Sequence, residues 1–125
     1  DHAKLNEEQN RAEMETLHAL IKANTGKEIT LFAPPSGSFS VTTLKVAEKM
    51  GYKTIMWSKD TIDWRDKSAK TVFSRATKNI SGGDFVLMHP KKHTLEALPQ
   101  IIDYYYNAGL KTGTVSECIS SETPV

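Results

Sequence analysis

The chain has 125 residues, of which 38% are hydrophobic and 25% are charged, a composition typical of a folded domain and not of a disordered segment. Its 16 Lys and Arg residues nearly balance its 15 Asp and Glu residues, and no basic cluster is interleaved with aromatic residues, so the sequence does not indicate nucleic-acid binding. No apolar run approaches the length of a membrane span. The single cysteine excludes an internal disulfide and an all-cysteine metal site.

The first predicted elements are a helix, a short strand and a rigid loop. Asn6, with Gln9 three residues later, predicts a capped helix start, and Gly26 predicts the end of that helix. Residues 29–32 are expected to form a strand, because the run is short and apolar. Residues 33–38 contain two consecutive prolines and should form a rigid strand exit.

The same order then recurs. Ser40 is expected to cap a second helix, residues 53–57 should form a β-branched and aromatic strand, and residues 58–66 should form a polar loop. A third helix should begin after Ser68 and end at the glycine pair 82–83.

The last predicted elements are a strand, a helix and a strand. The continuous apolar run 85–88 is typical of a strand buried on both faces. The fourth helix is expected over residues 94–107, with an irregular or delayed start at Pro99, and a fourth strand over residues 111–115. Apolar positions predict the inner face of this helix; they are Leu95, Leu98, Ile102 and Tyr105.

Alternation of about four helices with about four strands predicts an α/β fold with a parallel sheet and right-handed crossovers. The sheet could be a small three-layer structure or part of a (β/α) barrel. Ligands of such folds bind at the carboxyl ends of the strands, and three of the four segments that follow predicted strands hold unusual residues.

His89 directly follows the buried run 85–88, which would place its imidazole at the mouth of the sheet. There it could transfer a proton or bind a metal, or it could make a single structural hydrogen bond. Asp60, Asp63 and Trp64 form the second segment. The carboxylates could orient a histidine and the indole could stack on a sugar, whereas the structural alternative is an Asx-turn at Asp60 and a core position for Trp64.

Pro35, Ser36 and Gly37 form the third segment, in which preset backbone N–H groups could serve as an oxyanion hole or simply form a rigid loop. A serine nucleophile is not indicated, because Ser36 lacks the flanking pattern of a nucleophile elbow. His2, His18 and His93 match no metal-binding spacing, and His93, which follows two lysines, is expected to be solvated. The sequence predicts no metal site.

Taken in order, FAPPSGSFS, WSKDTIDW and the strand end Leu87-Met88-His89 resemble motifs of the polysaccharide deacetylase family, also known as the NodB-homology domain or carbohydrate esterase family 4. Residues 1–26 resemble the stretch just downstream of the zinc-binding histidine motif of the family. The resemblance covers nearly all 125 residues and implies that they form the C-terminal portion of such a domain. Sporulation and cell-wall deacetylases of spore-forming bacteria are the members that the chain resembles most.

The resemblance implies a distorted (β/α) barrel that hydrolyses N-acetyl groups of a cell-wall glycan with the help of zinc, whose bound water attacks the acetamide. His89 would be the general acid, oriented by Asp63 or, as the less favoured choice, by Asp60. Leu87 and Trp64 would line the acetyl pocket. The loop of Pro35, Ser36 and Gly37 would contact substrate, with the Ser36 N–H donating to the oxyanion.

Two departures from the family pattern change the expectation. The family's arginine, which pairs with the catalytic base, is Ala33 here, and the base and metal ligands belong to motifs upstream of Asp1. We therefore expect this chain alone to bind no zinc in family fashion and to release no acetate.

The alternative function is a non-catalytic glycan-binding or structural envelope protein; a flavodoxin-like module is disfavoured because no glycine-rich phosphate loop follows the first strand. The resemblance implies an extracellular or envelope location, and we expect self-association through sheet edges.

Overall fold

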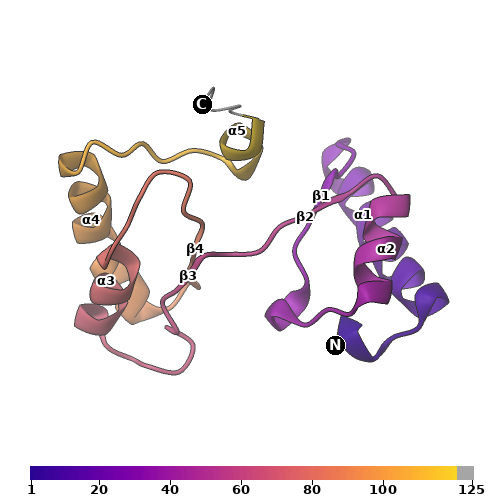
Figure 1. The fold of residues 1–125 in the computed structure, drawn as a ribbon, viewed down its shortest axis with the longest axis horizontal. Coiled ribbons are helices and arrows are strands. Elements are labelled where there is room, and N and C mark those ends of the chain that lie inside the picture. The colour runs from indigo at the N-terminus through magenta and orange to yellow at the C-terminus, as the bar shows by residue number, and fades with distance from the viewer. Residues whose placement is uncertain (121–125) are drawn as a thin grey trace. The chain divides into compact units, whose positions relative to one another are not determined.

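The computed structural model describes residues 1–120, which belong to two compact units (Figure 1). The first unit comprises Asp1–Met56 and the second begins at Trp57. Each unit holds one pair of parallel strands and its own hydrophobic core. The units are therefore described one at a time.

The first unit pairs two short strands that are joined through a helix. Strand β1 lies parallel to β2, with Leu31 opposite Lys53 and Phe32 opposite Thr54. In chain order the elements are a 3₁₀ turn at His2–Lys4, α1 (Glu7–Thr25), β1 (Leu31–Phe32), a 3₁₀ turn at Pro35–Gly37, α2 (Val41–Lys49) and β2 (Lys53–Thr54).

Local sequence signals define both helices of this unit. Asn6 accepts a hydrogen bond from the Gln9 backbone N–H while the Gln9 side chain accepts one from the Asn6 N–H, which is the expected capping box. Gly26 ends α1 at φ 72°, a left-handed conformation that glycine adopts without steric cost. Ser40 caps α2 as expected, with Thr43 as its reciprocal partner. These predictions are confirmed.

In the core of the first unit, one face of α1 and one face of α2 pack against the strand pair. Its buried apolar members are Met14, Phe32, Val46, Ala47 and Tyr52. Burying a side chain of the size of Met14, Phe32 or Val46 stabilises a domain by about 1.5–3 kcal/mol, before conformational entropy is counted.

The second unit repeats the strand–helix–strand arrangement. Strand β3 lies parallel to β4, with Lys59 opposite Val86 and Asp60 opposite Leu87. The core lies between α3 and α4, and its buried apolar members are Val72, Ala76, Ala97 and Ile101. In chain order the elements are β3 (Lys59–Asp60), α3 (Ala69–Thr77), β4 (Val86–Leu87), α4 (Lys92–Asn107) and α5 (Val115–Ser120).

The strand pattern differs from the prediction at two places. Strand β3 lies within the segment expected to be a polar loop, and residues 111–115, expected to form a strand, form none. Glu117 and Thr114 explain the second difference. The Glu117 carboxylate accepts from the Thr114 N–H, and the Glu117 N–H donates to the Thr114 hydroxyl, so this pair starts helix α5 instead.

The helices of the second unit also correct the prediction. Helix α3, capped by Ser68 as expected, ends at Thr77 and not at the glycine pair 82–83. Helix α4 starts at Lys92, earlier than expected, and contains Pro99. The carbonyl of Leu95, which cannot receive an N–H from Pro99, belongs to an exposed residue, so water can satisfy it.

The inner face of α4 is rotated relative to the prediction. Leu95 and Ile102 were expected to point inward, yet they are 69% and 47% exposed. The buried residues are Thr94, Ala97 and Ile101. The small side chain of Ala97 allows α3 and α4 to pack closely, and this advantage outweighs the larger apolar area of Leu95.

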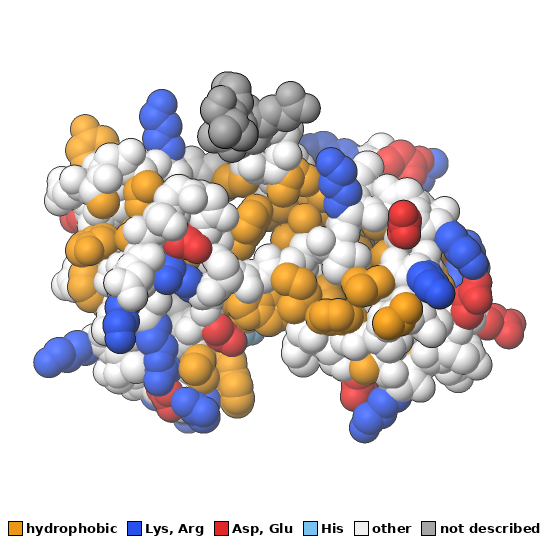
Figure 2. Space-filling view, in the orientation of Figure 1, with side chains coloured by type: hydrophobic (Ala, Val, Ile, Leu, Met, Phe, Trp, Pro, Cys, Tyr) orange, Lys and Arg blue, Asp and Glu red, His pale blue; other side chains and the backbone are white. Residues whose placement is uncertain are grey.

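Acidic and basic side chains are interspersed over the face drawn in Figure 2, without a large patch of either sign. This mixture agrees with a formal net charge of +1. Among residues 1–120, no helix has both the length and the apolar character needed to cross a membrane.

Candidate active site

Asp63 and His89 form a bonded pair in the second unit. The Nδ1 of His89 lies 2.7 Å from Oδ1 of Asp63, and the His89 backbone N–H donates to Oδ2 at 2.5 Å. The hydroxyl of Thr94 also donates to Oδ2, at 2.7 Å. Asp63 is fully buried, whereas the His89 side chain is 40% exposed. A buried carboxylate thus holds an imidazole that solvent can reach.

Parallel strand pairing brings the two residues together. Asp60 ends β3 opposite Leu87, which ends β4. Asp63 and His89 follow these strand ends by three and two residues, so both emerge at the carboxyl end of the same sheet. The Thr61 N–H and hydroxyl both donate to the Leu87 carbonyl, at 3.2 and 2.8 Å, and extend the contact past the last paired residues.

The environment of Asp63 favours its ionised form. Burial alone would raise the pKa of its carboxyl, but the hydrogen bonds from the His89 backbone, the His89 ring and Thr94 outweigh burial and lower the pKa. The ionised carboxylate can only accept hydrogen bonds, so Nδ1 of His89 carries the proton that it shares with Oδ1. Asp63 thereby fixes the tautomer of His89.

This arrangement leaves one nitrogen of His89 available for chemistry. Its Nε2 has no hydrogen-bond partner within residues 1–120. With Nδ1 directed at Asp63, Nε2 is the ring nitrogen that can exchange a proton with a bound group. Chemically, His89 can therefore donate a proton to a bound group or accept one from it.

The turn that presents Asp63 is strained. Ile62 has φ 53°, in the left-handed region that β-branched residues avoid, at a cost of about 1–3 kcal/mol. Asp60 offsets part of this cost, because its carboxylate accepts the Ile62 N–H at 2.9 Å. The Asx-turn alternative for Asp60 is thus confirmed, and the carboxylate bonded to His89 is that of Asp63.

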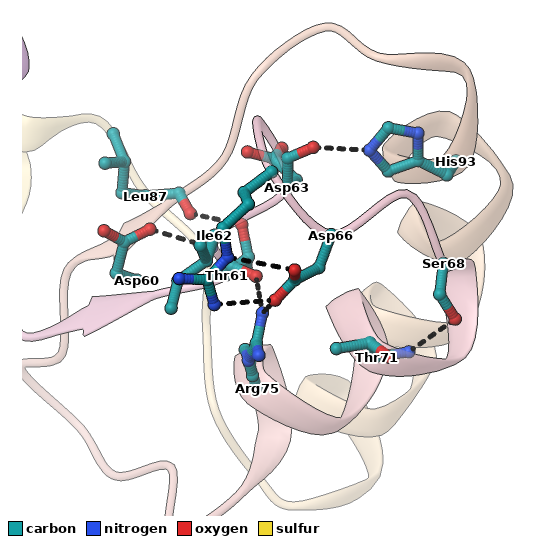
Figure 3. Close-up of polar contacts among 11 residues, drawn as sticks. Asp60, Thr61, Ile62, Asp63, Asp66, Ser68, Thr71, Arg75, Leu87 and His93 are labelled. Atoms are coloured by element: carbon teal, nitrogen blue, oxygen red, sulfur yellow. Dashed lines mark hydrogen bonds and ion pairs between the residues drawn. The ribbon is translucent and has the colours of Figure 1, made fainter.

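A second carboxylate stabilises the same turn from outside. Asp66 accepts two hydrogen bonds from Arg65 and one from Arg75, the last at 2.6 Å, and Arg75 also donates to the Thr61 carbonyl at 3.1 Å (Figure 3). The Arg65 and Arg75 guanidinium groups hold the pKa of Asp66 well below its usual range. Arg75 thereby ties the turn to helix α3.

Two residues at the site were not identified from the sequence as part of it. Thr94 donates to the Asp63 carboxylate, and His93, expected to be solvated, donates from Nε2 to the Asp63 backbone carbonyl at 2.6 Å (Figure 3). Both lie in the first turn of α4. His93 and Thr94 lie 30 and 31 residues after Asp63, so the local spacing of residues gives no sign of these contacts.

The other two site candidates of this unit are Trp64 and Leu87. Trp64 is 57% exposed, which excludes the alternative of a core position, and the Arg65 guanidinium lies 6.0 Å from the centroid of its ring. Leu87 is partly buried in β4. A cavity of about 460 Å³ is lined in equal parts by apolar and polar residues, His89 among them, of the segment after β4 and the start of α4; neither Trp64 nor Leu87 lines it.

Pro35, Ser36 and Gly37 lie in the first unit, so their expected proximity to His89 stays a prediction. Ser36 adopts φ 56°, and the Gly37 N–H donates to the Pro34 carbonyl at 2.9 Å. The Ser36 N–H has no acceptor within the described residues. A left-handed residue followed by Gly37 at φ 66° is compatible with an outward-facing amide donor.

The described residues do not form a site for the zinc ion that the family resemblance implies. Within residues 1–120, no group of three or more His, Cys, Asp or Glu side chains is arranged to hold a metal ion. The Asp63 carboxylate is already occupied by His89 and Thr94. No step of the chemistry is therefore assigned to a metal on these residues.

Comparison with known proteins links this chain to a family. A family model described as polysaccharide deacetylase matches residues 1–55. The uncharacterized protein YlxY of Bacillus subtilis is 36% identical over 97 residues, which make up 78% of this chain and 30% of the relative. A peptidoglycan-N-acetylglucosamine deacetylase of Bacillus cereus is 28% identical over 118 residues, or 90% of this chain and 43% of the relative.

Solved structures agree. The crystal structure of a CE4 family pseudoenzyme from Bacillus anthracis matches with a TM-score of 0.90 at 34% identity, and the match covers 95% of this chain and 42% of the other. The likeness confirms the α/β architecture of parallel strands alternating with helices. The chain spans less than half the length of each of these three relatives.

Proposed function

The chain belongs to the polysaccharide deacetylase family, and on that premise we propose that it supplies the general-acid half of an active site that removes N-acetyl groups from cell-wall glycan. The observation that carries the proposal is the buried, ionised Asp63 bonded to Nδ1 of a half-exposed His89. In this role Nε2 of His89 protonates the amine as it leaves the acetyl carbon.

The other residues have supporting roles in the proposal. Trp64 and Leu87 would line the acetyl pocket, and the Ser36 N–H would donate to the oxyanion, with Pro35 and Gly37 fixing that amide. Asp60, the less favoured partner of His89, shapes the turn by accepting the Ile62 N–H. The family resemblance implies zinc, which would be held by residues other than those described.

This division of labour predicts that the 125-residue chain alone does not release acetate from N-acetylated peptidoglycan or chitin oligosaccharides, with or without added zinc. A general acid contributes about 10²–10⁴ in rate, but it needs an activated water to act with. The assay measures acetate colorimetrically. Zinc-dependent release by the chain alone would contradict the proposal.

The role of His89 can be tested in a chimera, in which this chain replaces the matching segment of the Bacillus cereus deacetylase. The chimera should carry Ala33→Arg, which restores the family's arginine. His89→Ala should then lower kcat by about 10²-fold or more. His18→Ala is the matched control, because His18 lies in the first unit and bonds Tyr52 and Glu28, and it should leave kcat within about twofold. Equal activity with and without His89 would refute the assignment.

A second candidate function rests on Ala33 and on the similarity to a CE4 family pseudoenzyme. In this case the chain belongs to a protein that binds acetylated cell-wall glycan without hydrolysing it. The same chimera can be prepared with Ala33 kept and with the Ala33→Arg substitution. If both forms bind peptidoglycan in a pull-down and neither releases acetate, the result would favour this second function.

Both candidates place the protein's partner, acetylated cell-wall polysaccharide, outside the cell membrane. An envelope or extracellular location follows from that substrate. A role in sporulation stays a prediction.

A further inference from the structure

His93 donates a hydrogen bond to the backbone carbonyl of Asp63, so the backbone of this residue is held in place as well as its side chain. The Asp63 carbonyl belongs to a fully buried residue, and the His93 Nε2–H is its single donor within residues 1–120. A buried carbonyl without a donor is strongly unfavourable. His93 therefore does more than occupy the surface of α4.

The direction of this contact matters. A carbonyl oxygen only accepts, so His93 carries its proton on Nε2. Figure 3 shows the His93 ring directed at the Asp63 carbonyl. Thr94, the next residue, donates to the carboxylate of the same aspartate. Two consecutive residues of the first turn of α4 thus hold both ends of Asp63.

The turn needs such external support. Ile62, immediately before Asp63, has a left-handed conformation that the chain would avoid in isolation. Arg75 restrains the residue on the other side of Ile62 through the Thr61 carbonyl. If no group donated to the Asp63 carbonyl, the backbone at Asp63 could leave its strained conformation and displace the carboxylate.

We propose that His93 is a positioning residue, which holds the Asp63 backbone so that the carboxylate meets Nδ1 and the backbone N–H of His89 in the observed geometry. The importance of this positioning for catalysis rests on the proposed function. The geometry itself can be tested without any activity, so a failure here is distinct from a failure of the deacetylase proposal.

The experiment uses NMR on the ¹⁵N-labelled 125-residue chain at neutral pH. The ring ¹⁵N shifts of His89 report its tautomer, and exchange of the His89 amide reports its bond to Asp63. His93→Leu should shift the neutral His89 ring from the pure Nδ1–H tautomer toward a mixture. It should also speed exchange of the His89 amide about tenfold, the effect expected from losing one hydrogen bond to a buried group.

Two further variants make the test specific. His93→Gln keeps an N–H donor of similar reach and should preserve the wild-type His89 signals, while Lys92→Leu places the same leucine one residue earlier on an exposed position and should also preserve them. Unchanged His89 signals in His93→Leu would overturn the inference. Equal acceleration at the core amides of Val72 and Ile101 would overturn it too, because His93 would then support the whole unit.

Discussion

At the scale of the residue, Asp63 combines burial with full ionisation. Its carboxylate receives three hydrogen bonds, two from His89 and one from Thr94, and they outweigh the effect of burial on its pKa. Such an arrangement is stable only while its donors stay in place. The site therefore depends on the conformation of one turn.

The lowered pKa of Asp63 makes the second unit sensitive to acid. The folded pKa lies below the unfolded value of about 3.9, so the contribution to stability is complete well above that value and is lost as pH falls toward the folded pKa. Asp63→Asn should lower the free energy of unfolding by about 2 kcal/mol at neutral pH, and the loss should shrink as the wild type is acidified.

Urea unfolding can measure this difference through tryptophan fluorescence, because both tryptophans, Trp57 and Trp64, belong to the second unit. Asp103→Asn removes a charge from an exposed position of α4 and serves as the control. A loss that is the same at all pH values would show that Asp63 does not titrate as described.

The sequence was sufficient to predict the principal pair but not its supports. His89 follows a continuous apolar run, and its pairing with Asp63 was expected from the family resemblance. His93 and Thr94 reach Asp63 only after α4 packs beside the turn, a contact across 30 residues or more. Local patterns cannot contain such information.

At the scale of the element, helix ends were predictable and helix faces were less so. The caps at Asn6, Ser40 and Ser68 depend on bonds within a few residues and were found as expected. The inner face of α4 depends on how closely α3 approaches, and that distance is set by Ala97, whose small side chain gives a weak apolar signal. The strand expected at 111–115 does not form, because the hydrogen bonds between Thr114 and Glu117 start helix α5 there.

Two adjacent isoleucines of α4 test the corrected face. Ile101 is fully buried, so Ile101→Ala should cost about 2–5 kcal/mol of unfolding free energy through lost burial and the cavity left behind. Ile102 is 47% exposed, so Ile102→Ala should cost less than about 1 kcal/mol. Urea denaturation compares the two directly. Equal losses would contradict the orientation of the helix.

At the scale of the whole molecule, each strand of residues 1–120 has a neighbour on one side only. Unpaired strand edges offer backbone N–H and C=O groups to other chains. The sequence indicated four strands in parallel but could not show which backbone edges would stay unpaired, because pairing depends on contacts between distant segments.

These edges predict self-association. The apparent mass from light scattering after size-exclusion chromatography should rise above 13.9 kDa as the protein concentration increases. A proline substitution in β1, at Leu31, should reduce the effect if that edge is used, since proline cannot donate to a new strand. A constant monomer mass at high concentration would refute the prediction.

The two separate cores have a consequence for biosynthesis. Every buried apolar residue in the core of the first unit, from Met14 to Tyr52, precedes the boundary at Met56. Ribosomes deliver the chain from its N-terminus, and compact units can close as they emerge. The Asn6-capped helix and the β1–β2 pair, with the Ser36 loop between β1 and α2, can therefore be in place while Asp63 and His89 are still being translated.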